Sequence, residues 1–227
     1  MATRRVGGEP GLLLRAGLGV LLIATAAGLV LALLAEPVQP GLTDAVAGAL
    51  AASGTDNPVT AVLLNFRGYD TLLEIAVLTT TLVGVWALGT APRIRETTPS
   101  PILLGLNSVL LPLAALIGAY LLWVGATRPG GAFQAGAVLA AAGVLFILAG
   151  RRPATLIPDV PPRWSLVLGL AIFLAVSLAV MITGRHMLEY PDGLAGPLIL
   201  VIEAAATLSI AAILAGLFIG GRPEDEP

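Results

Sequence analysis

The stretch that decides the fold is PLILVIEAAATLSIAAILAGLFI, residues 197–219, an apolar run long enough to cross a membrane as a helix. It holds one ionisable side chain, the carboxylic acid of Glu203, and no other charge occurs between Asp192 and Arg222. A charged residue at the centre of a spanning helix costs roughly 2.5–3.5 kcal/mol on insertion scales. An acid kept at that depth therefore indicates a function, most often a place on a proton or cation path.

The composition of the whole chain is that of an integral membrane protein. Of its 227 residues, 57% are hydrophobic and 11% are charged, and the mean hydropathy is +0.94. Cysteine is absent and histidine occurs once, so we expect no disulfide and no Cys/His metal or iron–sulfur site. We find no nucleophile–base pair or cofactor motif, and therefore expect no cofactor and no enzymatic activity. Basic residues cluster no further than two adjacent arginines, which gives no support to nucleic-acid binding.

Six apolar stretches predict an all-α integral membrane protein with six transmembrane helices. A spanning helix needs about 20 apolar residues to cross roughly 30 Å of hydrocarbon. The first stretch is longer than the apolar region of a signal peptide, so we expect it to stay in the mature protein. The fourth is the shortest. The predicted helices are residues 12–35, 71–88, 102–126, 133–149, 165–183 and 197–219.

The placement of arginine predicts how these helices are oriented. All 12 of the lysine and arginine residues are arginines, and they fall nine on one side of the alternating helices and three on the other. The positive-inside rule places the richer side, and with it both termini, in the cytoplasm. We therefore expect a multi-pass protein of the cell (plasma or inner) membrane, surrounded by the lipid bilayer. The nine are Arg4, Arg5, Arg15, Arg93, Arg95, Arg151, Arg152, Arg163 and Arg222, and the three are Arg67, Arg128 and Arg185.

The outer connection between the first two helices, residues 36–70, is too long for a turn. Its alanine-rich part begins with a Thr-Asp pair at Thr43 and predicts a short helix at the membrane interface. The following run GTDNPVTAVLLNFRGYDT, residues 54–71, is apolar in its middle and interrupted by Pro58 and Gly68. Because it is too short to span as a helix, we expect an extended or re-entrant stretch covered by protein, or a surface loop.

Two further acids stand where the second helix begins. Asp70 and Glu74 are four residues apart, so on a helix they project from one face. Acids one turn apart repel each other when both ionise, which favours one that carries a proton, as a relay requires. Arg67 could offset one charge, or the Arg67–Asp70 pair is solvent-exposed and of little energetic value. Glu74 and Glu203 lie roughly 5 and 9 Å below their helix starts, so we hypothesise one shared polar region, within this chain or with a neighbour.

Two motifs in the sequence resemble motifs of a known family. The run NPVTAVLLNFRGYDTLLEI, residues 57–75, resembles the signature N-x-V-N-x-I-L-V-D-F-R-G-F-D-T-x-x-E-I. That signature lies near the C-terminus of the large A subunit of Mrp-type sodium/proton antiporters, and in the corresponding small subunit of membrane-bound hydrogenases. The run RPGGAFQAG, residues 128–136, is similar to the P-G-G-G-F-Q-G-G motif of the antiporter's B subunit. In that family a last helix with a glutamate follows, as Glu203 does here.

The resemblance covers about residues 12–220 and implies two domains. Residues 1–95 would be a two-helix module like the C-terminal region of the A subunit, and residues 96–227 a four-helix domain like the B subunit (MnhB). Asn65 stands where the family usually has aspartate, so a cation ligand at that position would be weaker. The candidates for an ion path are Asp70, Glu74 and Glu203, with Arg67, Thr71, Asn65 and Gln134 in support.

The resemblance implies an accessory membrane subunit of a multisubunit monovalent cation/proton antiporter. Its buried carboxylates would contribute to a proton or sodium path, and its partners would be other membrane subunits. One alternative is the equivalent ion-translocating subunit of a redox complex of the membrane-bound hydrogenase type. The other is an assembly scaffold that conducts no ion.

Overall fold

Every regular element in the part of the chain that the structure describes is a helix, which confirms the all-α fold class. The structure, a computed structural model, describes residues 12–35, 41–89, 101–149, 162–191 and 193–221. The chain divides into two units, residues 1–43 and residues 44–227. The first unit contains α1 (Leu12–Leu34), a 23-residue apolar helix.

Within the described ranges, five helices are long and apolar enough to cross a membrane: α1, α4 (Gly68–Leu88), α5 (Pro101–Val124), α7 (Pro162–Ile182) and α8 (Ala195–Ile219). The remaining apolar helix, α6 (Ala132–Leu148), has 17 residues. At 1.5 Å per residue it is about 26 Å long, slightly less than the roughly 30 Å of a hydrocarbon core. Each predicted stretch is therefore a helix, whereas a count of six spans stays a prediction.

The orientation of the helices also stays a prediction. Most of the arginines on which the predicted orientation depends lie outside the described residues. They are Arg4, Arg5, Arg93, Arg95, Arg151, Arg152 and Arg222.

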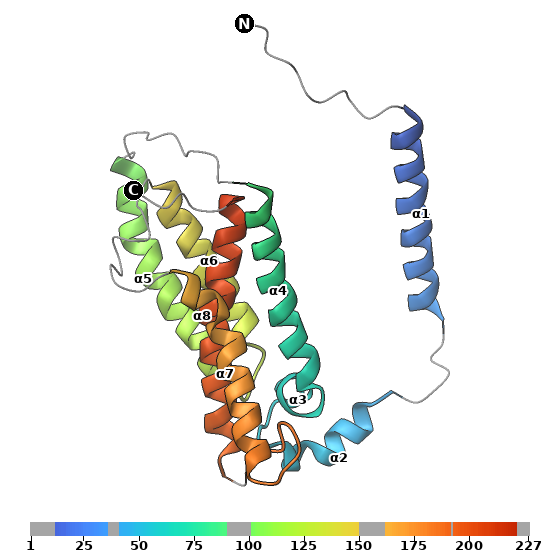
Figure 1. The fold of residues 1–227 in the computed structure, drawn as a ribbon, viewed down its shortest axis with the longest axis vertical. Helices are drawn as coiled ribbons and strands as arrows, with labels where there is room; N and C mark the ends of the chain where they lie inside the picture. The colour runs from blue at the N-terminus through green and yellow to red at the C-terminus, as the bar shows by residue number, and fades with distance from the viewer. Residues whose placement is uncertain (1–11, 36–40, 90–100, 150–161, 192, 222–227) are drawn as a thin grey trace, which may run out of the picture. The chain divides into compact units, whose positions relative to one another are not determined.

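Helix α8 lies at the centre of the second unit, packed against α4, α6 and α7, and α5 lies against α6 (Figure 1). Small residues bring these backbones close together. A Cβ atom on Gly136 of α6 would lie 2.8 Å from Cγ2 of Ile210, and one on Gly169 of α7 would lie 2.9 Å from Cβ of Ser209. The Ser209 hydroxyl donates a hydrogen bond of 2.6 Å to the carbonyl of Leu166, which joins α8 to α7.

Both sequence motifs lie at one end of this unit, here called the motif end. There α4, α6 and α8 begin and α5 and α7 end, in the lower half of Figure 1. The same end carries three short helices, α2 (Thr43–Ser53), α3 (Pro58–Ala61) and the π-helix η1 (Val62–Phe66). The sequence predicts that this end faces the outer side of the membrane. Helix α2 confirms the short helix predicted from Thr43.

Residues 58–66 are helical, so the prediction of an extended stretch or a plain surface loop is wrong. The side chain of Asn57 accepts a hydrogen bond of 3.0 Å from the backbone N–H of Val59, and Pro58 occupies the first helical position. Both residues are favoured at a helix start, because one satisfies a free N–H group and the other has its φ angle fixed. The chain continues as a π-turn, where the N–H of Arg67 donates to the carbonyl of Val62 at 2.8 Å. Helix α4 therefore begins at Gly68, earlier than predicted.

Candidate functional site

Glu203 is buried inside the helix bundle at the motif end. It lies on α8, eight residues after Ala195, which is about 12 Å along the helix axis. Its side chain is 5% exposed, and its carboxylate accepts a hydrogen bond from the backbone N–H of Ala132. Ala132 is the first residue of α6, so the carboxylate of one helix caps the N-terminus of its neighbour.

The start of α6 is a favourable place for a negative charge. The first N–H groups of a helix have no partner within it, and the aligned peptide dipoles give that end a partial positive charge. Thr207, one turn after Glu203, strengthens the same junction. Its hydroxyl donates to the carbonyl of Glu203 at 2.7 Å and also approaches the carbonyl of Ala132 at 3.5 Å. The protein thus offers Glu203 a specific polar environment inside the helix bundle.

The glycine before α6 leaves the space that this carboxylate fills. Gly131 has a φ angle of +105°, a conformation that L-residues rarely adopt. A Cβ atom at Gly131 would lie only 2.7 Å from Oε1 of Glu203. The predicted supporting residue Gln134 is exposed, and its Oε1 would lie 3.9 Å from the same Cβ position. The second motif therefore shapes the site of Glu203 through its backbone.

The first motif holds the turn that leads into α6. Asn57 is buried, and its Nδ2 donates to the carbonyl of Gly125 at 2.8 Å and to that of Arg128 at 2.9 Å. The hydroxyl of Thr60 donates to the Gly125 carbonyl at 2.7 Å. The hydroxyl of Thr55 donates to the carbonyl of Ala126 at 2.9 Å. Motifs that are far apart in the sequence thus meet at one turn.

Asn57→Leu is expected to destabilise the chain by about 2–4 kcal/mol. Leucine fills a similar volume but removes the helix cap, worth about 0.5–2 kcal/mol, and the two hydrogen bonds to the carbonyls of Gly125 and Arg128, together worth about 1–3 kcal/mol. The Gly125 carbonyl keeps the hydroxyl of Thr60 as a donor. The temperature of half-unfolding of the purified protein checks this. Thr55→Val is the matched control, because it removes only an exposed hydrogen bond of 2.9 Å to the same turn and a long one of 3.4 Å from the backbone N–H of Asn57, and it should change stability by about 1 kcal/mol. Equal effects of the two variants would contradict the role given to Asn57.

Tyr190, in the loop between α7 and α8, joins the π-helix to this interior. Its hydroxyl donates to the carbonyl of Leu64 at 2.9 Å, and its side chain is buried. Tyr190 and Leu64 belong to the same buried cluster as Ile199 and Ile202, the residues of α8 next to Glu203. Burial raises the pKa of the Tyr190 hydroxyl, and the negative charge of Glu203 raises that pKa further. The hydroxyl is therefore held in its protonated form, as a hydrogen-bond donor.

Two other predicted residues stabilise the same region. The side-chain Nδ2 of Asn65 donates to the carbonyl of Leu188 at 3.3 Å, which ties η1 to the loop that carries Tyr190. The hydroxyl of Thr71 donates to the carbonyl of Leu63 at 2.7 Å, and Thr71 is buried. Asn65 acts here as a donor, a role that an ionised aspartate could not take.

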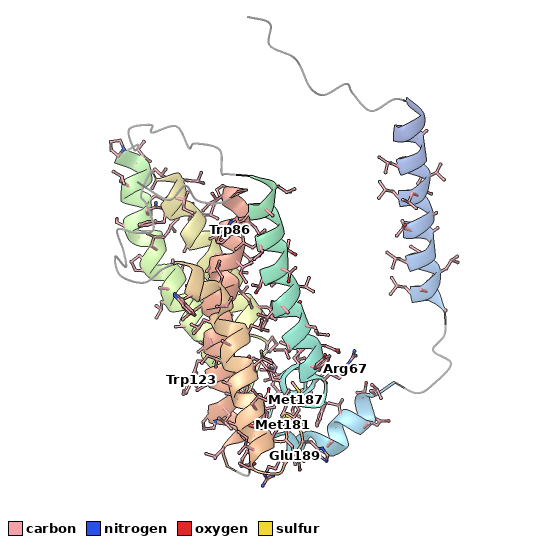
Figure 2. All side chains as sticks on the ribbon, viewed as in Figure 1. Arg67, Trp86, Trp123, Met181, Met187 and Glu189 are labelled. Carbon is pink, nitrogen blue, oxygen red and sulfur yellow. The ribbon has the colours of Figure 1, made fainter. Side chains whose placement is uncertain are left out.

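The acids of α4 lie in a different environment from Glu203. Arg67 and Asp70 form an ion pair of 2.5 Å, with side chains that are 65% and 52% exposed. Figure 2 shows Arg67 directed away from the bundle. Glu74 is exposed on the surface of α4, while Ile75 beside it is fully buried. The structure thus does not bring Glu74 and Glu203 into one polar region within this chain, and a path shared through a neighbour stays a prediction.

Sequence reasoning missed three residues of the site, Asn57, Tyr190 and Thr207. The Asn57-Pro58 pair is a typical helix start, so its capping role could have been predicted. Its hydrogen bonds to residues 125 and 128 could not, because nothing in the local pattern indicates so distant a partner. Tyr190 and Thr207 carry no sequence signal that separates them from other polar residues near helix ends.

The fold and the site define an all-helical, multi-pass membrane protein with a buried carboxylate at a helix junction. A family model described as "Domain related to MnhB subunit of Na+/H+ antiporter" matches residues 102–222, more than half of the chain, and the chain belongs to this family. A second family model, MbhE, which describes the E subunit of MBH, matches residues 13–101. A search of curated proteins finds no match.

Solved structures of two membrane complexes contain similar chains. A chain of the membrane-bound sulfane sulfur reductase, an archaeal respiratory membrane complex, is 25% identical, with a TM-score of 0.68 over 91% of this chain and 97% of that one. A chain of the Mrp complex from Dietzia sp. DQ12-45-1b is 19% identical, with a TM-score of 0.68 over 97% of this chain and 27% of that one. The second likeness shows the fold alone. The resemblance to Mrp-type and hydrogenase-type subunits that the two motifs indicate is confirmed.

Proposed function

We propose that this chain is an accessory membrane subunit of a multisubunit monovalent cation/proton antiporter, and that Glu203 contributes to its proton or sodium path. Membership of the MnhB-related family supports the class of complex. The observation that carries the role of Glu203 is its burial against the N-terminus of α6. Among the buried residues that the structure describes, it is the only charged one.

The chemistry of this position suits an ion carrier. The positive end of α6 favours the ionised carboxylate, while the surrounding apolar side chains favour the neutral form or a bound cation. A group balanced between these states can take up an ion and release it again. Such a balance is what a step on a translocation path needs.

The proposed function also implies a topology for the chain and a set of partners. All six apolar helices would span the cell membrane, with both termini in the cytoplasm and the motif end on the outer side. The partners would be other membrane subunits, and the chain would have no enzymatic activity of its own. Asp70 and Glu74 would meet a neighbouring subunit, since an acid exposed at membrane depth is costly unless it is covered and paired.

A specific observation favours each of two alternatives. The match to nearly the whole of a chain from a respiratory complex favours a redox-driven complex as the host, with the same local chemistry. The hydrogen bond between Glu203 and Ala132 within this chain favours a scaffold, in which the carboxylate only joins helices. Such a bond contributes about 0.6–2 kcal/mol in a membrane.

The test is to purify the chain with an affinity tag from native membranes and to identify the subunits that accompany it. We expect several membrane subunits, and sodium- or potassium-driven proton movement when the complex is reconstituted into vesicles. Recovery with redox subunits and no cation-driven proton movement would favour the redox host. Recovery of the chain alone would contradict a role as a complex subunit.

A further inference from the structure

A small pocket opens at the motif end, next to α2. It has a volume of about 220 Å³. One wall is the end of α2 with Ala51, Ala52 and Gly54, and the other is the segment leading into α8, with Tyr190 and Ala195 among its residues. Ala51 and Ala52 are exposed, so the pocket opens to the surroundings of the chain. A liquid water molecule takes up about 30 Å³, so the pocket has room for several.

Tyr190 separates this pocket from the buried interior. The residue lines the pocket, yet its side chain is only 7% exposed. Its hydroxyl reaches inward to the carbonyl of Leu64, on a π-helix, an element that often marks functional sites. Tyr190 therefore belongs both to the lining of the pocket and to the buried cluster that includes Ile199 and Ile202 of α8.

The distance from pocket to carboxylate is short. Ala195 lines the pocket, and Glu203 lies eight residues further along the same helix, or about 12 Å. Between them, Ile199 is one turn below Ala195 and 2% exposed. Burial raises the pKa of the Tyr190 hydroxyl, and the negative charge of Glu203 adds to this shift.

The backbone of the loop that carries Tyr190 has an unusual conformation. Gly184 and Gly193 have φ angles of +82° and +75°, and no atom lies within 4 Å of a Cβ placed on either. Leu188, between them, has a φ angle of +63°, an unusual conformation for a bulky residue. Leu188 is buried and its carbonyl accepts a hydrogen bond from Asn65, so the backbone before Tyr190 is held in place and access to the interior depends on the Tyr190 side chain.

We propose that this pocket is the aqueous access route to Glu203, and that Tyr190 is the gate between the pocket and the carboxylate. The proposal rests on the function proposed above for Glu203. The ion that passes is the one that a carboxylate binds, a proton or a small monovalent cation. Rotation of the Tyr190 side chain would withdraw its hydroxyl from Leu64 and connect the pocket to the interior.

Single-cysteine variants of the assembled complex test the route, because the chain itself contains no cysteine. The probe is a positively charged, membrane-impermeant methanethiosulfonate, added to vesicles while ion exchange is recorded. Ala52→Cys places the thiol in the pocket, and modification is expected to lower exchange at least about tenfold, equivalent to 1.4 kcal/mol. Val59→Cys, 61% exposed and outside the pocket lining, is the control, whose modification should leave exchange unchanged.

The gate is tested with Ile199→Cys, whose thiol would lie behind Tyr190. With Tyr190 present we expect slow modification, and with Tyr190→Ala modification at least about tenfold faster, again 1.4 kcal/mol. Tyr190→Phe keeps the ring but loses the hydrogen bond to Leu64, so it should accelerate modification to a smaller extent. If the complex that contains Ala52→Cys fails to assemble, Ala51→Cys is used in its place.

Two results would overturn the proposal: unchanged exchange after modification at Ala52 or Ala51, or equal reactivity of Ile199→Cys with and without Tyr190. Glu203→Gln separates this failure from a failure of the proposed function. If Glu203→Gln stops exchange but the pocket thiols do not affect it, the access route alone is wrong. If Glu203→Gln leaves exchange intact, the function proposed for the carboxylate is wrong, and the route with it.

Discussion

Glu203→Gln is expected to lower ion exchange by the assembled complex roughly 10²-fold or more, the range over which a positioned acid–base group contributes. Glutamine has nearly the same size, and its amide oxygen can still accept the hydrogen bond from the N–H of Ala132. The cap on α6 should therefore persist, and the complex should assemble normally. What glutamine lacks is the ability to gain and lose a proton or to attract a cation.

The measurement is cation-driven proton movement in vesicles, normalised to the amount of complex that co-purifies with the tagged chain. Asp44→Asn is the matched control, because Asp44 is an exposed acid in the first turn of α2, outside the pocket lining and outside the loop that carries Tyr190. We expect that variant to exchange ions normally. Full exchange by Glu203→Gln with intact assembly would show that the carboxylate is a structural cap, and would favour the scaffold interpretation.

The contacts around Glu203 also connect the two motifs that lie far apart in the sequence. Asn57 and Thr60 of the first motif bind the carbonyl of Gly125 and so position the turn before α6. That turn sets the place of the α6 N-terminus, and the α6 N-terminus binds the carboxylate of Glu203. A change in the first motif should therefore reach Glu203 through the backbone of the second.

The helices could be predicted from the sequence because the membrane fixes their length and composition. The predicted range 71–88 and α4 share the same end at Leu88, and the predicted range 133–149 differs from α6 by one residue at each end. The burial of Glu203 was also foreseeable, since an acid in so long an apolar run must avoid lipid. In each case the apolar environment of the membrane determines the structure.

The sequence could not decide which faces of the helices meet. Helix α4 is apolar nearly all round, so its pattern does not show that Ile75 faces the core while Glu74 is exposed. The helical conformation of residues 58–66 depends on the cap by Asn57, in a segment too short for its periodicity to be informative. The contact between Glu203 and Ala132 joins residues that are far apart in sequence, and only the packed structure shows it.

Gly131→Ala is expected to destabilise the protein by about 2–6 kcal/mol. Part of this, about 1–3 kcal/mol, is the strain of a φ angle of +105° with an extended ψ, a region that is nearly exclusive to glycine. The rest, about 1–3 kcal/mol, is overpacking, because the new Cβ would lie 2.7 Å from Oε1 of Glu203. The temperature of half-unfolding of the purified complex measures the sum, and ion exchange should fall as the carboxylate is displaced.

Two comparisons separate these contributions. Gly184→Ala introduces a side chain at a φ angle of +82° in open space, so it should show backbone strain alone and a smaller loss of stability. In a double-mutant cycle, Gly131→Ala should be less harmful when Glu203 is already alanine, because the oxygen that it would meet is gone. An effect of Gly131→Ala that equals that of Gly184→Ala and is independent of Glu203 would show that the carboxylate does not occupy this space. The glycine of the second motif would then serve only the geometry of the turn.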